Sequence, residues 1–219
     1  MNIAPYIDHT ILKQETTTAN VIQLCAEAVD AGFKAVCIPP FYVTEAVRHL
    51  KDTGVKVATV IGFPFGYSLS AMKAEEAELA MMGGADELDM VINIGALKSG
   101  NSKLLESEIG NVLEVVKLRG KVIKVIVESG ILTDQELEQV CQLYSHYDID
   151  FMKTSTGFAA TGATVKAVQT MRKLLPERIA IKASGGIRTY AFAKELIDAG
   201  ATRLGCSAGL QIVAESHLS

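Results

Sequence analysis

Two lysines stand where the sequence indicates amine chemistry. Lys153 and Lys182 each end a short apolar run, and small or hydroxylated residues follow at once, in segments 150–157 and 179–186. Such runs are typical of buried strands that lead into loops, and lysine is seldom buried without a reason. A lysine at a strand end can also extend its ammonium group into solvent, so each one alone has a structural explanation. Their joint placement favours a site in which one amine attacks a carbonyl.

A lysine nucleophile needs a lowered pKa, and a second lysine nearby can provide it. A lysine with a pKa of ~10.4 is neutral in roughly one molecule in two thousand at pH 7, and a protonated amine cannot attack a carbonyl. Adjacent strands lie ~4.8 Å apart, so two inward ammonium groups about 6 Å apart repel by about 2.8 kcal/mol at an effective dielectric constant of about 20. This equals about two pKa units, and desolvation adds to it. The pair therefore predicts one neutral and one charged lysine, without saying which is the nucleophile.

Other charged residues interrupt the neighbouring apolar runs. Asp89 lies within segment 87–93, and Lys124 and Glu128 share one face of the run that begins at residue 122. Because side chains alternate between the two faces of a strand, one barrel interior can hold all three together with both lysines. Asp89 is interpreted as a proton carrier, with a simple ion partner as the alternative. For Lys124 and Glu128 we expect an ion pair that fills the interior.

Strand-like and helix-like segments alternate along the whole chain. The predicted strands are 6–12, 34–39, 55–63, 87–94, 122–127, 150–153, 179–182 and 203–206. The predicted helices are 18–31, 43–52, 71–82, 103–118, 134–144, 164–174, 191–199 and 209–214. Such alternation predicts parallel pairing in a single α/β domain over residues 1–219, a closed (β/α)₈ TIM barrel. A doubly wound open sheet is the alternative, but no Gly-x-Gly-x-x-Gly follows a strand.

Two loops rich in small residues follow the last two predicted strands. Segments 183–188 and 205–209 each precede a helix, so backbone N–H groups and positive helix ends converge where barrels commonly bind phosphate. Tight turns are the alternative explanation, but two such loops at these positions favour a phosphate site. Gly157 can add backbone donors, while the hydroxyls before it can equally cap the next helix.

Composition limits the classes of partner. The net charge of −4 provides no broad basic surface for nucleic acid or an anionic membrane. Neither a signal segment nor an apolar run of ~18 residues is found, so we expect a cytoplasmic protein with no membrane partner. The four cysteines and four histidines lack ligand spacing, so no metal is expected. Small soluble molecules are the expected partners, and the chain leaves a homo-oligomer open.

The motifs of this chain resemble those of a known family along nearly its whole length. They occupy residues 7–10, 36–40, 62–66, 87–93, 151–158 and 182–188. Together they are highly specific and resemble the deoxyribose-phosphate aldolases. The resemblance implies a TIM-barrel class I aldolase that reversibly cleaves 2-deoxy-D-ribose 5-phosphate into acetaldehyde and D-glyceraldehyde 3-phosphate. It further implies a lysine Schiff base, with no metal or other cofactor.

The same resemblance implies a role for individual residues. Lys153 matches the lysine that forms the Schiff base, Lys182 the neighbour that lowers its pKa, and Asp89 the acid/base that works through a water. Asp8 and Lys124 match polar residues that support this network. The phosphate would be bound by Gly157, Gly185, Gly186, Gly205 and Ser207.

The chain departs from the family pattern at two places. Phe158 stands where some members have a lysine, and residues 216–219 replace a terminal tyrosine that reaches the site in some members. Neither contact is therefore carried over to this chain. Two other functions remain as alternatives, a metal-independent sugar-phosphate isomerase or epimerase on the same barrel and a non-catalytic protein that binds a phosphorylated ligand.

Overall fold

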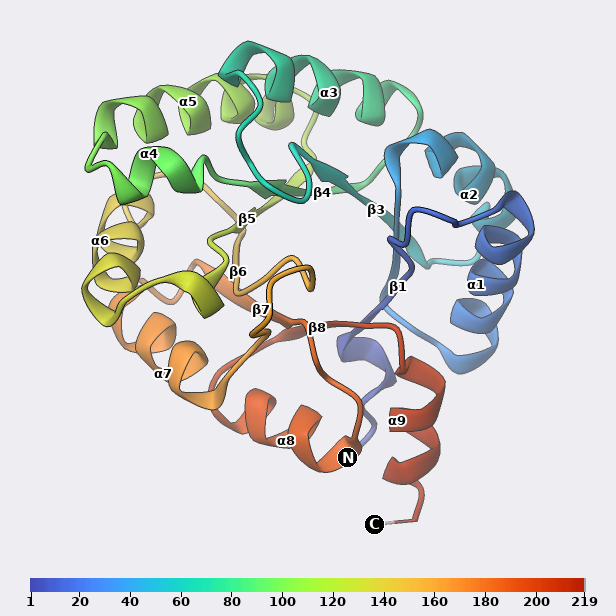
Figure 1. Ribbon diagram of the computed structural model, residues 1–219. Helices are drawn as coiled ribbons and strands as arrows, with labels where there is room; N and C mark the ends of the chain where they lie inside the picture. The colour runs from blue at the N-terminus through green and yellow to red at the C-terminus, as the bar shows by residue number, and fades with distance from the viewer. Residues whose placement is uncertain (219) are drawn as a thin grey trace.

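A computed structural model describes residues 1–218, in which parallel strands close into one barrel in chain order. The strands are β1 (Ile7–Thr10), β2 (Ala35–Ile38), β3 (Lys56–Ile61), β4 (Glu87–Val91), β5 (Val122–Ile126), β6 (Phe151–Lys153), β7 (Ala180–Ser184) and β8 (Arg203–Cys206). Parallel pairing of β8 with β1 closes the ring, which is visible at the centre of Figure 1. The predicted (β/α)₈ barrel is confirmed, and the alternative open sheet is wrong.

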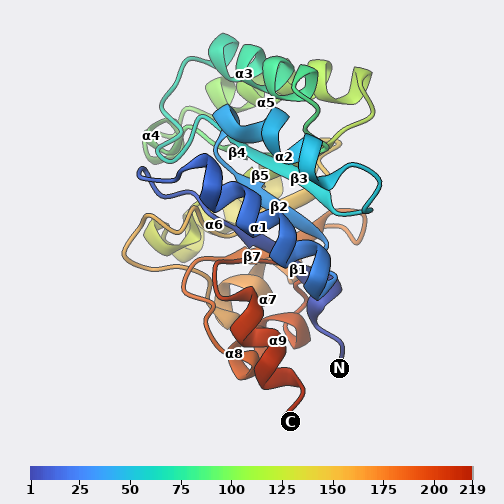
Figure 2. The ribbon, with the colours of Figure 1, turned by 90° about the vertical axis from the view of Figure 1, so that its right-hand side faces the viewer.

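Helices form an outer ring around these strands (Figure 1), and Figure 2 shows the same barrel from the side. They are α1 (Thr18–Ala31), α2 (Val43–Leu50), α3 (Ser70–Met82), α4 (Ile94–Lys98), α5 (Ser102–Leu118), α6 (Asp134–Tyr144), α7 (Val165–Leu174), α8 (Tyr190–Asp198) and α9 (Gly209–Ser216). Residues 1–218 also contain the short 3₁₀ helices η1 (Ala4–Tyr6), η2 (Pro40–Tyr42) and η3 (Ser129–Ile131). Within residues 1–218, no helix combines the length and apolar character that a membrane crossing requires. Ser219, the last residue of the terminal segment compared above, lies outside the described residues.

The sequence prediction extends the fourth strand into α4, a helix that it does not anticipate, and the reason lies in a helix cap. The run 87–94 was expected to be one strand, but β4 ends at Val91 and α4 begins at Ile94. The side-chain oxygen of Asn93 accepts a hydrogen bond from the backbone N–H of Ala96 at 3.0 Å. This cap stabilises the helical turn in place of a longer strand. The strand therefore ends two residues after Asp89, close to the open end of the barrel.

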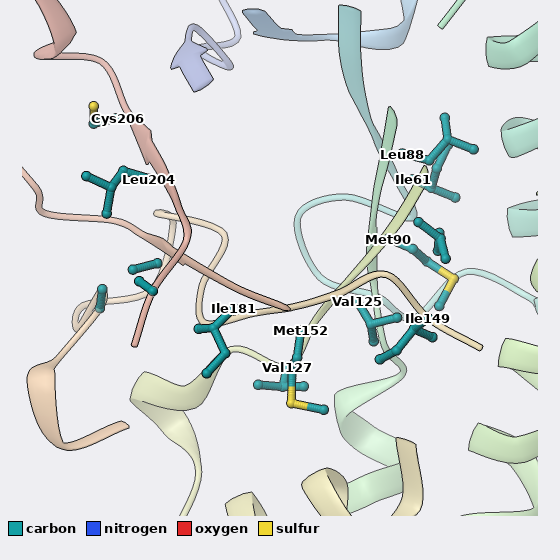
Figure 3. Packing of buried hydrophobic residues seen from close by; sticks show 14 of the residues in the cluster. Ile61, Leu88, Met90, Val125, Val127, Ile149, Met152, Ile181, Leu204 and Cys206 are labelled. Carbon is teal, nitrogen blue, oxygen red and sulfur yellow. The ribbon is translucent and has the colours of Figure 1, made fainter. Parts of the chain in front are cut away.

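The two faces of β4 and β5 carry different kinds of side chain. Leu88, Met90 and Val125 are completely buried, and Figure 3 shows them between the strand ribbons and the surrounding helices. Asp89 and Lys124 alternate with them, so their side chains take the opposite face and lie inside the barrel. The apolar layer between strands and helices thus stabilises the fold, while the interior holds these charged side chains together with a small apolar cluster of Cys37, Ala58 and Val60.

Candidate active site

The two lysines singled out by the sequence meet inside the barrel. Residues Lys153 and Lys182 lie directly opposite each other in the pairing of β6 with β7. The Nζ atom of Lys153 lies 2.8 Å from Oδ2 of Asp89, and the Nζ atom of Lys182 lies 2.7 Å from the same oxygen. Two nitrogens that share one oxygen at these distances are close enough to interact strongly with each other.

The surroundings of the two amines push their pKa values in opposite directions. Burial, with a further contribution from the charge of Lys182, lowers the pKa of Lys153 although Asp89 favours its protonated form. Burial also opposes the charge of Lys182, but Asp8 and Asp89 outweigh it and raise the pKa of Lys182. The sequence argument assigned most of the effect to repulsion between the lysines, whereas burial is the larger cause. Lys153 is therefore the amine that is prepared to lose its proton.

Asp89 lies at the centre of these contacts as an ionised carboxylate. Its Oδ1 accepts a hydrogen bond from Lys124 at 2.7 Å, while its Oδ2 accepts from both Lys153 and Lys182. Burial favours the protonated acid, but the charges of these lysines hold the pKa of Asp89 well below its usual value. A carboxylate that contacts both amines can accept a proton from one side of the site and return it to another.

A second layer of charged residues lies beneath this centre. Lys124 contacts Oε2 of Glu87 at 2.7 Å, and Arg203 donates to Oδ1 of Asp8 at 2.7 Å and to Oε2 of Glu87 at 3.0 Å. Although burial opposes the ionised form of Asp8, the cations around it lower its pKa to about 2. Sequence reasoning missed Glu87 and Arg203. Strand alternation could have found Glu87, because it precedes Asp89 by two residues and therefore shares its face.

The expected ion pair between Lys124 and Glu128 is wrong. The strand β5 ends at Ile126, and Glu128 has a left-handed backbone conformation with φ of 54°. Its carboxylate accepts hydrogen bonds from the backbone N–H of Thr156 at 3.2 Å and from the hydroxyl of the same residue. Burial raises the pKa of Glu128, although its contacts with Thr156 oppose that shift. Glu128 therefore holds the loop after β6 instead of neutralising the barrel interior.

The hydroxyl residues that follow Lys153 connect two neighbouring strand ends. The hydroxyl oxygen of Thr154 accepts from the backbone N–H of Ser184 at 3.0 Å, and the hydroxyl of Ser184 donates to the carbonyl of Ser155 at 2.5 Å. The helix cap of α7 is provided by Thr164 instead. The alternative in which the earlier hydroxyls cap this helix is therefore wrong. These contacts hold the end of β6 against the end of β7, and with them the two lysines.

A cavity of about 780 Å³ opens at the carboxyl ends of the strands, and Lys153 lies in its wall. The residues predicted to bind phosphate all line it: Gly157, Gly185, Gly186, Gly205 and Ser207. Lys13 and Arg188 also line it, and neither was singled out from the sequence. Phe158 lines the cavity too and packs edge to face against Phe63, with 5.3 Å between ring centroids. The cavity therefore joins a reactive amine to loops that can bind an anion.

Three glycines allow the loops after β6 and β7 to pack backbone against backbone. A Cβ atom on Gly162 would lie 2.2 Å from the carbonyl oxygen of Gly185. Gly185 has φ of +85°, and a Cβ atom there would approach the Cα atoms of Gly162 and Gly157 at 3.0 and 3.4 Å. Larger residues cannot occupy these positions without moving a backbone segment that lines the cavity. Gly162 is a positioning residue that the sequence analysis did not identify.

Comparison with known proteins agrees with this geometry. Residues 3–215 match the family described as DeoC/LacD family aldolase. The deoxyribose-phosphate aldolase of Caldicellulosiruptor saccharolyticus is 47% identical over 214 residues, which cover 97% of each chain. The deoxyribose-phosphate aldolase of Streptococcus pneumoniae is 49% identical over 213 residues, which cover 97% of this chain and 96% of the other.

Solved structures of aldolases also resemble this chain over nearly its whole length. The deoxyribose phosphate aldolase of Aeropyrum pernix superimposes with a TM-score of 0.91 at 31% identity, covering 98% of this chain and 91% of that chain. An aldolase named QR15 superimposes with a TM-score of 0.93 at 36% identity, covering 99% and 96% of the two chains. By its full-length match and by these identities, the chain belongs to the deoxyribose-phosphate aldolases of the DeoC/LacD family.

Proposed function

We propose that this chain, as a single catalytic domain over residues 1–219, reversibly cleaves 2-deoxy-D-ribose 5-phosphate into acetaldehyde and D-glyceraldehyde 3-phosphate. The observation that carries the proposal is the contact of Lys153 and Lys182 with one oxygen of Asp89. Burial lowers the pKa of Lys153, which supports this residue as the Schiff-base nucleophile. The names of the relatives support the choice of substrate.

The first half of the reaction forms the covalent intermediate. The neutral amine of Lys153 attacks C1 of the open-chain sugar, and the resulting carbinolamine loses water to give a protonated imine. Lys182 enters this step charged between its two carboxylates, donates the proton that the leaving water needs, and regains a proton when the imine is hydrolysed. The imine is an electron sink, so it replaces the unstable carbanion that direct cleavage of the sugar would produce.

The second half breaks the bond between C2 and C3. A base removes the proton of the C3 hydroxyl, C3 becomes the aldehyde carbon of glyceraldehyde 3-phosphate, and the bonding electrons move into an enamine on Lys153. Asp89 is the base we assign to this step, acting directly or through one water, because it is ionised and contacts both amines. Protonation of the enamine at C2 and hydrolysis of the imine then release acetaldehyde and regenerate the lysine.

The phosphate of the sugar is assigned to the opposite end of the same cavity. The backbone N–H groups around Gly185, Gly186 and Ser207 lie in loops that line it, and Lys13 and Arg188 add positive charge. Anchoring the phosphate aligns the bond to be broken with the amine, an effect worth several kcal/mol in well-oriented reactions. Phe158 presents an apolar surface to this cavity and has no charge with which to bind the phosphate.

Trapping the intermediate tests this function directly. We expect borohydride reduction in the presence of acetaldehyde to add an ethyl group to Lys153, identified by the mass of the peptide that contains it. Cleavage of the sugar phosphate is measured in parallel by coupled detection of glyceraldehyde 3-phosphate. Absence of an adduct together with sugar-phosphate isomerisation would instead establish the isomerase or epimerase alternative. Binding of a phosphorylated ligand without any turnover would establish the non-catalytic one.

We expect Gly162→Ala to weaken binding of the phosphorylated sugar and to leave the amine intact. The added Cβ collides with the backbone of Gly185, so the loops that line the cavity must separate. The expected result is a rise in KM of at least about tenfold, which corresponds to about 1.4 kcal/mol of binding energy. Trapping of acetaldehyde, which has no phosphate, should change less than about twofold.

Gly110→Ala is the matched control for this experiment. Gly110 lies in α5 and a Cβ atom there meets nothing within 4 Å, so the variant should keep the KM of the unmodified enzyme. An unchanged KM in Gly162→Ala, or an equal loss of acetaldehyde trapping, would contradict the assigned role of the loops.

A further inference from the structure

The charged residues inside the barrel do not balance if every one of them is ionised. The interlocked carboxylates are Asp8, Glu87 and Asp89, and the interlocked cations are Lys124, Lys153, Lys182 and Arg203. None of these residues is more than 6% exposed. Three negative and four positive charges leave one positive charge without a partner. A buried uncompensated charge is costly, so the interior is more stable with one proton fewer.

The contacts indicate which group gives up that proton. Lys124 contacts two carboxylates at 2.7 Å each, and Lys182 contacts two at 2.5 and 2.7 Å. Arg203 also contacts two carboxylates, and a guanidinium does not lose its proton in proteins. Lys153 has one carboxylate partner, Asp89 at 2.8 Å. The neutral amine therefore belongs to Lys153, because the other cations are each held by two anions.

We propose that Glu87 and Arg203 are positioning residues that set the charge of the barrel interior and thereby assign the neutral amine to Lys153. The inference rests on the proposed Schiff-base function and deepens it. Glu87 and Arg203 are the first residues of β4 and β8, so they lie at the strand ends away from the cavity and do not line it. Glu87 acts through Lys124, which it contacts and which contacts Asp89 in turn. Arg203 acts through Asp8, which it contacts and which contacts Lys182 in turn. Arg203 is held in place further by the ring of Phe151, 5.3 Å from its guanidinium carbon.

Titratable groups from several strands surround Lys153. The neighbouring charged or titratable groups are Asp89 on β4, Lys182 on β7, Cys37 on β2 and Glu128 after β5, with Asp8 on β1 and Lys124 on β5 behind them. Burial raises the pKa of Cys37, so this thiol stays neutral and leaves the count of charges unchanged. Glu128 hydrogen-bonds to Thr156 and forms no ion pair with the interior cations, although the charge of Lys153 acts on it. Cys37 and Glu128 are the same in the unmodified enzyme and in variants of Glu87 and Arg203, so the change in interior charge in those variants comes from the interlocked residues alone.

Two substitutions that each remove one charge should shift the pH profile in opposite directions. Glu87→Gln removes an anion, which makes the interior more positive, so Lys153 should lose its proton at lower pH. Arg203→Met removes a cation, so Lys153 should keep its proton to higher pH. A unit charge about 10 Å away at an effective dielectric constant of about 20 shifts a pKa by roughly one unit. We expect the acid limb of kcat/KM, which reports the essential base of the free enzyme, to move by that amount each way.

The double variant Glu87→Gln with Arg203→Met is the decisive measurement. It removes one anion and one cation, so the acid limb should return to within about 0.3 units of the unmodified enzyme. If the two substitutions acted only by disturbing the structure, their effects on kcat/KM would add in the double variant and would not cancel. Glu108→Gln is the matched control, since Glu108 on α5 is the completely buried carboxylate of an ion pair with Lys73 on α3, outside the barrel. It should lower the melting temperature and leave the acid limb in place.

The outcomes separate this inference from the proposed function. Opposite shifts in the single variants, cancelled in the double variant, support it. The charge assignment is overturned if the acid limbs do not move, or if both move in the same direction, provided that the variants show a cooperative melting transition. If Arg203→Met does not fold, the direction of the Glu87→Gln shift alone decides. Failure of the unmodified enzyme to trap acetaldehyde would overturn the proposed function itself, whereas successful trapping with unmoved limbs would overturn the charge assignment alone.

Discussion

Replacing Lys153 with methionine is expected to reduce kcat for sugar-phosphate cleavage by about 10⁴-fold or more, to the level that binding alone provides. The substitution removes the amine that forms the imine. Lys182 cannot replace it, because Asp8 and Asp89 keep that residue protonated. The measurement is steady-state cleavage together with borohydride trapping, which should label no lysine within the cavity.

The Lys153→Met variant should remain folded, which makes the loss of activity interpretable. Lys153 is 2% exposed, so methionine fills its space and removes a charge that is costly to bury. Asp89 keeps its contacts with Lys124 and Lys182. Lys166→Met serves as the control, because that lysine is 74% exposed in an ion pair with Asp134 and should have no influence on activity. Retention of more than about one hundredth of the activity in Lys153→Met would assign the nucleophile to another group.

Lys182→Met is expected to lower kcat/KM by about 10²- to 10⁴-fold near neutral pH, by a different route. A cation beside an amine disfavours its protonated form, so removal of Lys182 raises the pKa of Lys153. Lys153 and Asp89 then form an ordinary ion pair, and the amine stays charged near neutral pH. The deficit in kcat/KM relative to the unmodified enzyme should be greatest at low pH, where Lys153 of the variant is protonated. It should shrink as the pH rises through the new pKa of Lys153.

Alkaline recovery distinguishes the two lysine variants. At about pH 9 to 10, Lys182→Met should again trap acetaldehyde on Lys153, since the amine is then partly neutral. Lys153→Met should trap none at any pH. An equal deficit of Lys182→Met at every pH would show that this lysine acts only in proton transfer, and would remove its role in lowering the pKa of its neighbour.

Most of the reactive centre could be predicted from alternation and from strand ends. Lys153 and Lys182 end their strands, and Asp89 occupies an inward position on β4, so their meeting at one oxygen follows from the barrel. The same reasoning failed for Glu128, because it extended the alternation of β5 past its last residue, Ile126. A backbone that turns into the left-handed region redirects a side chain in a way that alternation cannot anticipate.

The charged layer beneath the centre was missed for a different reason. Sequence reasoning looked for chemistry at the carboxyl ends of strands, whereas Glu87 and Arg203 are the first residues of β4 and β8. Their significance depends on contacts that cross the interior between strands distant in the chain, and one sequence contains no record of those contacts. The end of β4 was likewise misplaced, because the cap at Asn93 depends on the orientation of a single side chain.

The two faces of β4 separate the residues that stabilise the fold from the residues that carry the chemistry. Leu88 and Met90 face the helical shell (Figure 3), while Asp89 contacts the lysines. Heat tolerance can therefore be engineered at even-numbered positions of this strand, and reactivity at odd-numbered ones, with little interference between the two. Such a division leaves natural variation free to alter one trait at a time, and it makes this scaffold suited to the redesign of carbon–carbon bond chemistry.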